Sequence, residues 1–150
     1  MDLVRSSSLP PALLAHLVAV SLYAGFQLTV RLLVYPQMAA VPSEAFAAYE
    51  ADHQRRITPL VAVLFVAVGV TTLLLLLDGD LPRVATWAAA ALFAVVLGAT
   101  ALGAVPQHAV LSSGFDAQAH ARLLGWDAVR LVAALGQVVV SVGLVARTST

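Results

Sequence analysis

A proline, an amide and an imidazole stand together in the segment AVPQHAVL, residues 104–111, where a long uncharged stretch ends. The imidazole of His108 could carry acid–base chemistry, because histidine has an unperturbed pKa of ~6.5 and exchanges a proton near neutral pH. His53, in the connection that follows the first uncharged stretch, is a candidate for the same role. We therefore expect these two histidines to be the general acid and base of any reaction that the chain catalyses.

Other polar side chains are predicted to lie at the same membrane face as these histidines. Polar and ionisable groups within a membrane are costly, and they usually face the interior of a helix bundle or a cavity. Two interpretations follow: a pocket for a small molecule, or an interior network that only holds the helices together. The convergence of so many groups favours the pocket, and the two roles can coexist. The set comprises Gln37, His53, Gln107, His108, Trp126, Asp127 and Arg130.

Residue spacing also gathers polar groups on single helix faces. One face, with steps of 7, 4 and 4 residues, carries His16, Tyr23, Gln27 and Arg31. A second face, with steps of 3, 7 and 4 residues, carries Asp127, Arg130, Gln137 and Ser141. Arg31 and Asp127 should lie at similar depth, and a guanidinium offers a two-pronged fork to a carboxylate. We therefore predict a buried ion pair between Arg31 and Asp127, and we count both residues among those that bind the substrate.

A metal site is a separate interpretation of the same region. His53, His108 and His120 belong to one side of the membrane, and three imidazoles would suit a Zn, Cu or Fe ion. The three histidines come from separate segments, and the chain has no local H-E-x-x-H pattern. The cofactor therefore stays open between such a metal ion and none. We expect His120 to be exposed and His16, near the opposite end of its helix, to be a packing residue.

The elements that position these residues follow from composition. The chain has 150 residues, of which 61% are hydrophobic and 11% charged, whereas soluble proteins are about 25% charged. Residues 6–30, 57–77 and 84–107 contain no charged side chain, and a fourth gap at 131–146 reaches spanning length by extending back through 121–130. A transmembrane helix needs ~20 such residues. We predict a single all-α membrane domain over 1–150, a bundle of four transmembrane helices at about 11–35, 57–77, 83–108 and 121–146.

The connection between the first two spans has helical character of its own. Its segment SEAFAAYEADHQRR is rich in helix formers, and Ser43 could cap its first turn. Phe46, Tyr49, His53 and Arg56 fall on one face of such a helix. We therefore predict a short amphipathic helix between the first and second spans.

The two halves of the chain resemble each other. VYPQMAAV ends the first span and AVPQHAVL ends the third, so the Pro-Gln pair recurs after 70 residues. Each pair is followed by a phenylalanine, a histidine and an arginine before the next span. This repeat is compatible with a duplicated helical hairpin, related by an axis along the membrane normal.

Several functions are disfavoured by what the sequence lacks. There is no cysteine, so disulfides and thiolate chemistry are excluded, and a net charge of zero gives no reason to expect nucleic acid. All eight basic residues are arginine, which is typical of a GC-rich bacterial genome and favours a bacterial inner (cytoplasmic) membrane. Arg5 flanks the first span and weakly favours cytoplasmic termini.

A family resemblance rests on short motifs spread over most of the chain. They are a Tyr-Pro pair ending the first span, a Phe…His…Arg-Ile segment, a Pro-x-His-x-x-Leu corner ending the third span, and a Leu-Leu-x-x-Asp-x-x-Arg start of the fourth. With these motifs the chain resembles the small four-helix membrane proteins that include anthrone oxygenases and many uncharacterised bacterial relatives. The matching residues are Tyr35, Pro36, Phe46, His53, Arg56, Ile57, Pro106, His108, Leu111, Leu123, Leu124, Asp127 and Arg130.

The resemblance implies oxidation of an aromatic, polyketide-like molecule by O₂ without an evident organic cofactor. It casts His108 as the base and His53 as its partner. Arg130 and Arg56 would stabilise the enolate, while Gln37, Gln107 and Trp126 would position a flat substrate. Many relatives carry Asn and then Trp near the start of the fourth helix, whereas this chain has Trp126-Asp127-Ala128. That departure leaves the substrate undefined.

Two other classes of function remain alongside a membrane oxidoreductase. The chain could be a non-catalytic protein that binds a lipid or an apolar metabolite, or one that supports a partner enzyme. It could also be a small transporter, which the internal repeat alone supports. In each case the expected partners are a hydrophobic small molecule and membrane lipid, and a homo-oligomer is compatible with the sequence.

Overall fold

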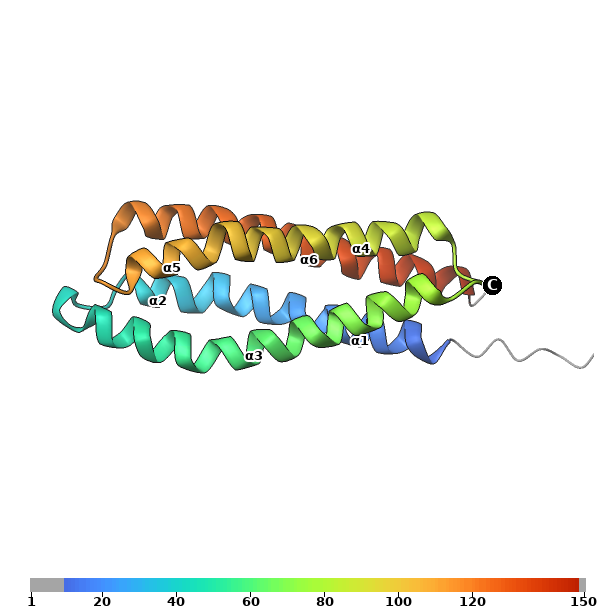
Figure 1. Cartoon of the computed structure of the whole chain (residues 1–150), viewed down its shortest axis with the longest axis horizontal. Helices are drawn as coiled ribbons and strands as arrows, with labels where there is room; N and C mark the ends of the chain where they lie inside the picture. The colour runs from blue at the N-terminus through green and yellow to red at the C-terminus, as the bar shows by residue number, and fades with distance from the viewer. Residues whose placement is uncertain (1–9, 149–150) are drawn as a thin grey trace, which may run out of the picture.

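The computed structural model describes residues 10–148 and consists of four helical rods laid side by side (Figure 1). Each rod runs antiparallel to the next one along the chain. No strand occurs in this described part. The rods are α1 (Pro11–Thr29) continued by η1 (Val30–Val34) and α2 (Tyr35–Met38), then α3 (Ser43–Leu77), then α4 (Arg83–Gly98) continued by η2 (Ala99–Ala104) and α5 (Val105–Leu111), and last α6 (Ala117–Thr148).

All four rods are long and apolar enough to cross a membrane, so the chain is a multi-pass integral membrane protein. Each predicted span lies within one rod, which confirms the four-helix architecture. The first described residues and the end of α6 lie at the same end of the bundle (Figure 1). The connections 39–42 and 112–116 lie at the other end, which we call the connection end.

The rods pack in a ring that follows their order in the chain. α1 contacts both α3 and α6, and α4 contacts the same two helices from the other side. Three apolar clusters fill the interior from end to end, and many leucines and valines on the outside remain exposed, as expected for surfaces that face lipid. The cluster at the end that holds the termini consists of Leu13, Leu75, Leu81 and Leu144.

The amphipathic segment between the first two spans is not a separate helix, which corrects the prediction. Residues 43–56 form the first part of α3, which continues without a break through Pro59 to Leu77. The reason is that this stretch holds helix formers and no glycine, so nothing ends the helix before the apolar run starts. Ser43 does not cap it, because its hydroxyl donates to the carboxylate of Glu44 and accepts no hydrogen bond from a backbone N–H of the first turn.

A π-helical segment precedes the proline in both the first and the third rod. η1 stands just before Pro36 and η2 just before Pro106. Proline lacks an N–H group, and its ring clashes with the carbonyl four residues earlier in an α-helix. A wider turn relieves this clash and lets the helix continue. Because the two segments occur at matching places in the two halves, they add a structural match to the repeated Pro-Gln pair.

Gly103 lets the third rod approach the fourth closely. A Cβ atom at this position would stand 2.2 Å from Cδ2 of Trp126, well inside van der Waals contact. The indole of Trp126 therefore lies directly on the backbone of η2. At Gly98, five residues earlier in the same rod, a Cβ would meet nothing within 4 Å.

We predict that Gly103→Ala destabilises the protein by about 1–3 kcal/mol, the usual cost of an overpacked contact. Gly98→Ala is the matched control, and it should leave stability unchanged or raise it by up to ~1 kcal/mol through helix propensity. Thermal unfolding of both variants in the same detergent measures the difference. Equal behaviour of the two variants would show that the Trp126 contact is not a constraint on the fold.

Candidate functional site

An internal cavity of about 290 Å³ lies near the connection end of the bundle. Its apolar wall comes from the first rod, α3 and the third rod, whereas α6 contributes only Arg130. Thr58 on α3 and Val105 and Ala109 on α5 line the cavity and are also exposed, so it is open between these two helices, toward the lipid. The polar residues that line it are Gln27, Tyr35, His53, Gln54, Thr58, Thr100, His108 and Arg130.

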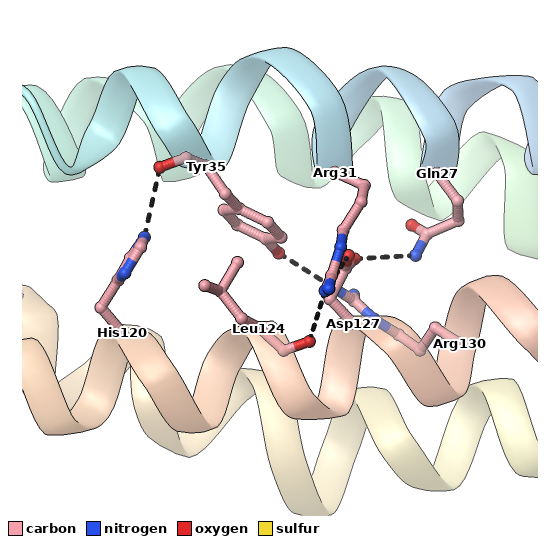
Figure 2. A network of polar contacts seen from close by, with 7 residues as sticks. All are labelled: Gln27, Arg31, Tyr35, His120, Leu124, Asp127 and Arg130. Carbon is pink, nitrogen blue, oxygen red and sulfur yellow. Dashed lines mark hydrogen bonds and ion pairs between the residues drawn. The ribbon is translucent and has the colours of Figure 1, made fainter.

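One polar wall is built on the carboxylate of Asp127, which is fully buried. Its Oδ1 accepts hydrogen bonds from Nε2 of Gln27 and from a terminal nitrogen of Arg130, both at 3.1 Å. Its Oδ2 pairs with a terminal nitrogen of Arg31 at 3.5 Å, which confirms the predicted ion pair. Figure 2 shows these side chains reaching between α6 and the rod of α1 and α2. The network joins the first and last helices of the chain.

Arg130 carries this network into the cavity. Its terminal nitrogen also donates to the hydroxyl of Tyr35 at 2.9 Å (Figure 2). Its Nε is buried and has no partner among the described residues. Two guanidiniums, of Arg31 and Arg130, share the single carboxylate of Asp127, so this wall holds one uncompensated positive charge. An anionic group of a ligand would be stabilised next to Arg130.

The opposite wall holds a carboxylate–histidine pair that the sequence analysis did not single out. Oε1 of Glu50, a fully buried residue, lies 2.6 Å from Nδ1 of His108. With Glu50 ionised, Nδ1 donates its proton to Oε1, and Nε2 of the ring then carries a free lone pair. A carboxylate behind an imidazole fixes its tautomer and stabilises the imidazolium that forms when it acts as a base.

Gln54 fixes this pair in place. Its Nε2 donates to Oε1 of Glu50 at 2.8 Å and lies 2.9 Å from the hydroxyl of Ser112. These contacts tie α3 to the end of α5. Phe46, Glu50 and Gln54 follow one another at intervals of four residues, so the sequence shows that they share one helix face. The sequence does not show that His108, across the bundle, is the residue this face contacts.

His53 and His108 come together, as predicted. Their rings stack with centroids 5.7 Å apart and planes 26° from parallel, and both line the cavity. The ring of Tyr49 stacks on the other side of His53, with centroids 6.3 Å apart. The cavity thus brings two acid–base candidates close to Arg130, which is the third residue predicted to be catalytic.

None of the six residues predicted to bind the substrate lines the cavity, and four of them take no part in its walls. Gln37 is exposed, because the buried residues of α2 are Tyr35 and Met38, and helical spacing turns Gln37 away from them. Gln107 is half-buried beside His108 but does not line the cavity either. The indole of Trp126 packs against the backbone of Gly103 and does not reach the cavity lining.

Arg56 is the fourth of these residues. It is exposed and pairs through Nε with Oδ2 of Asp52 at 2.6 Å. It lines a neighbouring groove instead of the cavity. Arg31 and Asp127, also predicted in the pocket, stand behind Arg130 and hold it without lining the cavity themselves.

The predicted set of three histidines is not assembled as a metal site. In residues 10–148 no group of three or more histidine, aspartate or glutamate side chains is arranged to hold a metal ion. His120 is buried, contrary to the expectation that it is exposed, and its Nε2 lies 3.2 Å from the carbonyl oxygen of Tyr35 (Figure 2). His16 is a buried packing residue, as expected, with Nδ1 at 3.0 Å from Oγ1 of Thr71.

Comparison of the chain with protein-family models, with curated proteins and with solved structures gives no match. The chemistry of the site must therefore be argued from its own geometry.

We predict that Asp127→Asn destabilises the protein by about 3–5 kcal/mol, because it leaves two buried or half-buried guanidiniums without their counter-charge. Asp52→Asn is the matched control. Asp52 also pairs with two arginines, Arg55 and Arg56, but at the surface, where ion pairs contribute little. Unfolding of both variants by SDS titration from mixed micelles, followed by circular dichroism, compares them. A similar loss in both variants would contradict a special role for the buried network.

Proposed function

We propose that this chain is a membrane-embedded oxidoreductase that uses O₂ to oxidise a hydrophobic aromatic or polyketide-like molecule, in the manner of the anthrone oxygenases that it resembles. One observation carries the proposal: a carboxylate-backed base, His108, and an under-compensated cation, Arg130, line the same largely apolar cavity. This combination suits a reaction in which an apolar molecule loses a proton and becomes an anion.

The proposed reaction begins at a methylene group made acidic by a neighbouring carbonyl. Nε2 of His108 accepts a proton from this carbon, and Glu50 stabilises the imidazolium that results. The carbonyl oxygen of the substrate gains the negative charge and lies toward the unpartnered Nε of Arg130. His53, stacked on His108, serves as the second acid–base group.

O₂ is the oxidant, and the overall change is CH₂ plus O₂ to C=O plus H₂O. The electron-rich enolate transfers electrons to O₂, a carbon–oxygen bond forms, and the proton held by the site completes a hydroperoxide. Removal of the second proton from the same carbon then breaks the O–O bond, which releases water and leaves a carbonyl. The protein supplies the base, the acid and the cation, and the substrate supplies the electrons.

We further propose that the protein resides in a bacterial cytoplasmic membrane with its termini in the cytoplasm. Its exclusive use of arginine over lysine and the position of Arg5 support this proposal. Arg5 itself lies outside the described residues. The opening between α3 and α5 would receive an apolar substrate from the bilayer.

The direct test uses purified protein in liposomes with anthrone as the probe, following O₂ uptake and formation of anthraquinone. We expect His108→Ala to lower kcat by about 10²–10⁴-fold, the usual contribution of a general base. Arg130→Met should also lower kcat, because the enolate loses its cation. His16→Asn is the matched control, since His16 lies eleven residues before Gln27 on α1, about 16 Å from the cavity wall, and it should keep the wild-type rate.

Two results would decide against this function. Wild-type protein that oxidises anthrone no faster than empty liposomes, yet binds it saturably, would identify a non-catalytic binding protein. Undiminished turnover by His108→Ala would remove the carboxylate–histidine pair from the mechanism.

A further inference from the structure

A second hollow, a groove of about 420 Å³, lies between α3 and the rod of α1 and η1. It backs onto the cavity, because four residues line both: Phe26, Val30, His53 and Ile57. Unlike the cavity, the groove includes the charged side chains of the α3 surface. The proposed oxidation makes no use of it.

The lining of this groove changes from charged to apolar along the helix axis. Asp52 and Arg56 stand at one end, and Leu60 at the other lies eight residues beyond Asp52, or about 12 Å along α3. Phe26 and Ile57 also belong to the apolar lining of the groove. A molecule that fills the groove must therefore have a polar end and an apolar end.

The membrane fixes how this gradient is oriented. The charge-free run 57–77 of α3 is about 31 Å long at ~1.5 Å per residue, which matches the ~30 Å hydrocarbon core of a bilayer. Arg56 is therefore at the boundary between hydrocarbon and headgroups, and the apolar end of the groove points toward the middle of the bilayer. A phospholipid in one leaflet is oriented in the same way, with its charged headgroup at this boundary and its acyl chains toward the middle of the bilayer.

The charged end of the groove favours an anion. Arg55 and Arg56 share the carboxylate of Asp52, so one positive charge is uncompensated. Their side chains are 74% and 75% exposed, which leaves them accessible to a headgroup. Guanidinium groups bind phosphate oxygens in a forked geometry, and arginines near the membrane surface attract anionic lipids.

We infer that this groove is a binding site for an anionic phospholipid, with its phosphate at Arg56, next to which Arg55 adds positive charge, and one acyl chain along Phe26, Ile57 and Leu60. The inference stands on the groove alone and holds whether or not the chain oxidises anthrone. Because His53 lines both the groove and the cavity, a lipid bound in the groove would contact His53 from the side opposite to the substrate.

The test is native mass spectrometry of the detergent-purified protein with added 1-palmitoyl-2-oleoyl phosphatidylglycerol, or with phosphatidylcholine of the same chains. We expect the first phosphatidylglycerol to bind at least about fivefold more tightly than phosphatidylcholine. Arg56→Gln should lower the affinity for phosphatidylglycerol by about fivefold, as expected for one arginine near an anionic headgroup. Arg122→Gln is the matched control, an exposed arginine near the same end of the bundle but outside the groove, and it should bind as wild type does.

A second variant tests the apolar end without changing charge. Leu60→Trp fills the groove at a half-exposed position and should weaken phosphatidylglycerol binding, and Thr29→Phe fills it from α1 if the first variant does not fold. Equal affinity of the wild type for the two lipids would overturn the inference. So would equal losses in Arg56→Gln and Arg122→Gln, or unchanged binding when the groove is filled.

Discussion

The buried carboxylate of Asp127 is the interaction on which the rest of the structure depends. Removing a charge from water is expensive, and a carboxylate inside a membrane bundle persists only when cations and donors surround it. Here Gln27 and Arg31 of the first rod and Arg130 of α6 do so. Their contacts fix how the first and last helices sit against each other, and they leave one positive charge to face the cavity.

The cavity opens between α3 and the third rod. If the two hairpins are copies, the interface between α1 and α6 corresponds to the interface between α3 and the third rod. The first interface holds the buried Asp127 network, whereas the second is joined near the connection end by Glu50 and Gln54 with His108, and farther along by packing of α3 against α4. Exposed residues of the cavity lining, Thr58 and Val105, lie about one helical turn from this junction, farther from the connection end. If the hairpins are copies, divergence of two equivalent interfaces accounts for one sealed side and one open side.

The fold was predictable because lipid restricts the chain so strongly. Charge-free runs defined the four spans, and helical spacing was enough to pair Arg31 with Asp127, since both had to be buried at one depth. The Glu50–His108 pair was not predictable, because it depends on how α3 extends beyond the membrane. Gln37 lies on the exposed side of α2, opposite to its expected place in the pocket. Trp126 packs on the backbone of Gly103, a contact that periodicity does not encode.

The charges of the site have a consequence for the proposed chemistry. Before reaction the two polar walls carry opposite charges, an excess guanidinium charge beside Asp127 and a carboxylate at Glu50. Transfer of a proton from an apolar substrate to His108 creates an anion on the substrate and a cation on the imidazole. Each new charge forms beside an opposite charge that folding has already placed and desolvated, so little reorganisation is needed at the moment of transfer. In a largely apolar cavity, that arrangement is what would make a weakly acidic carbon reactive.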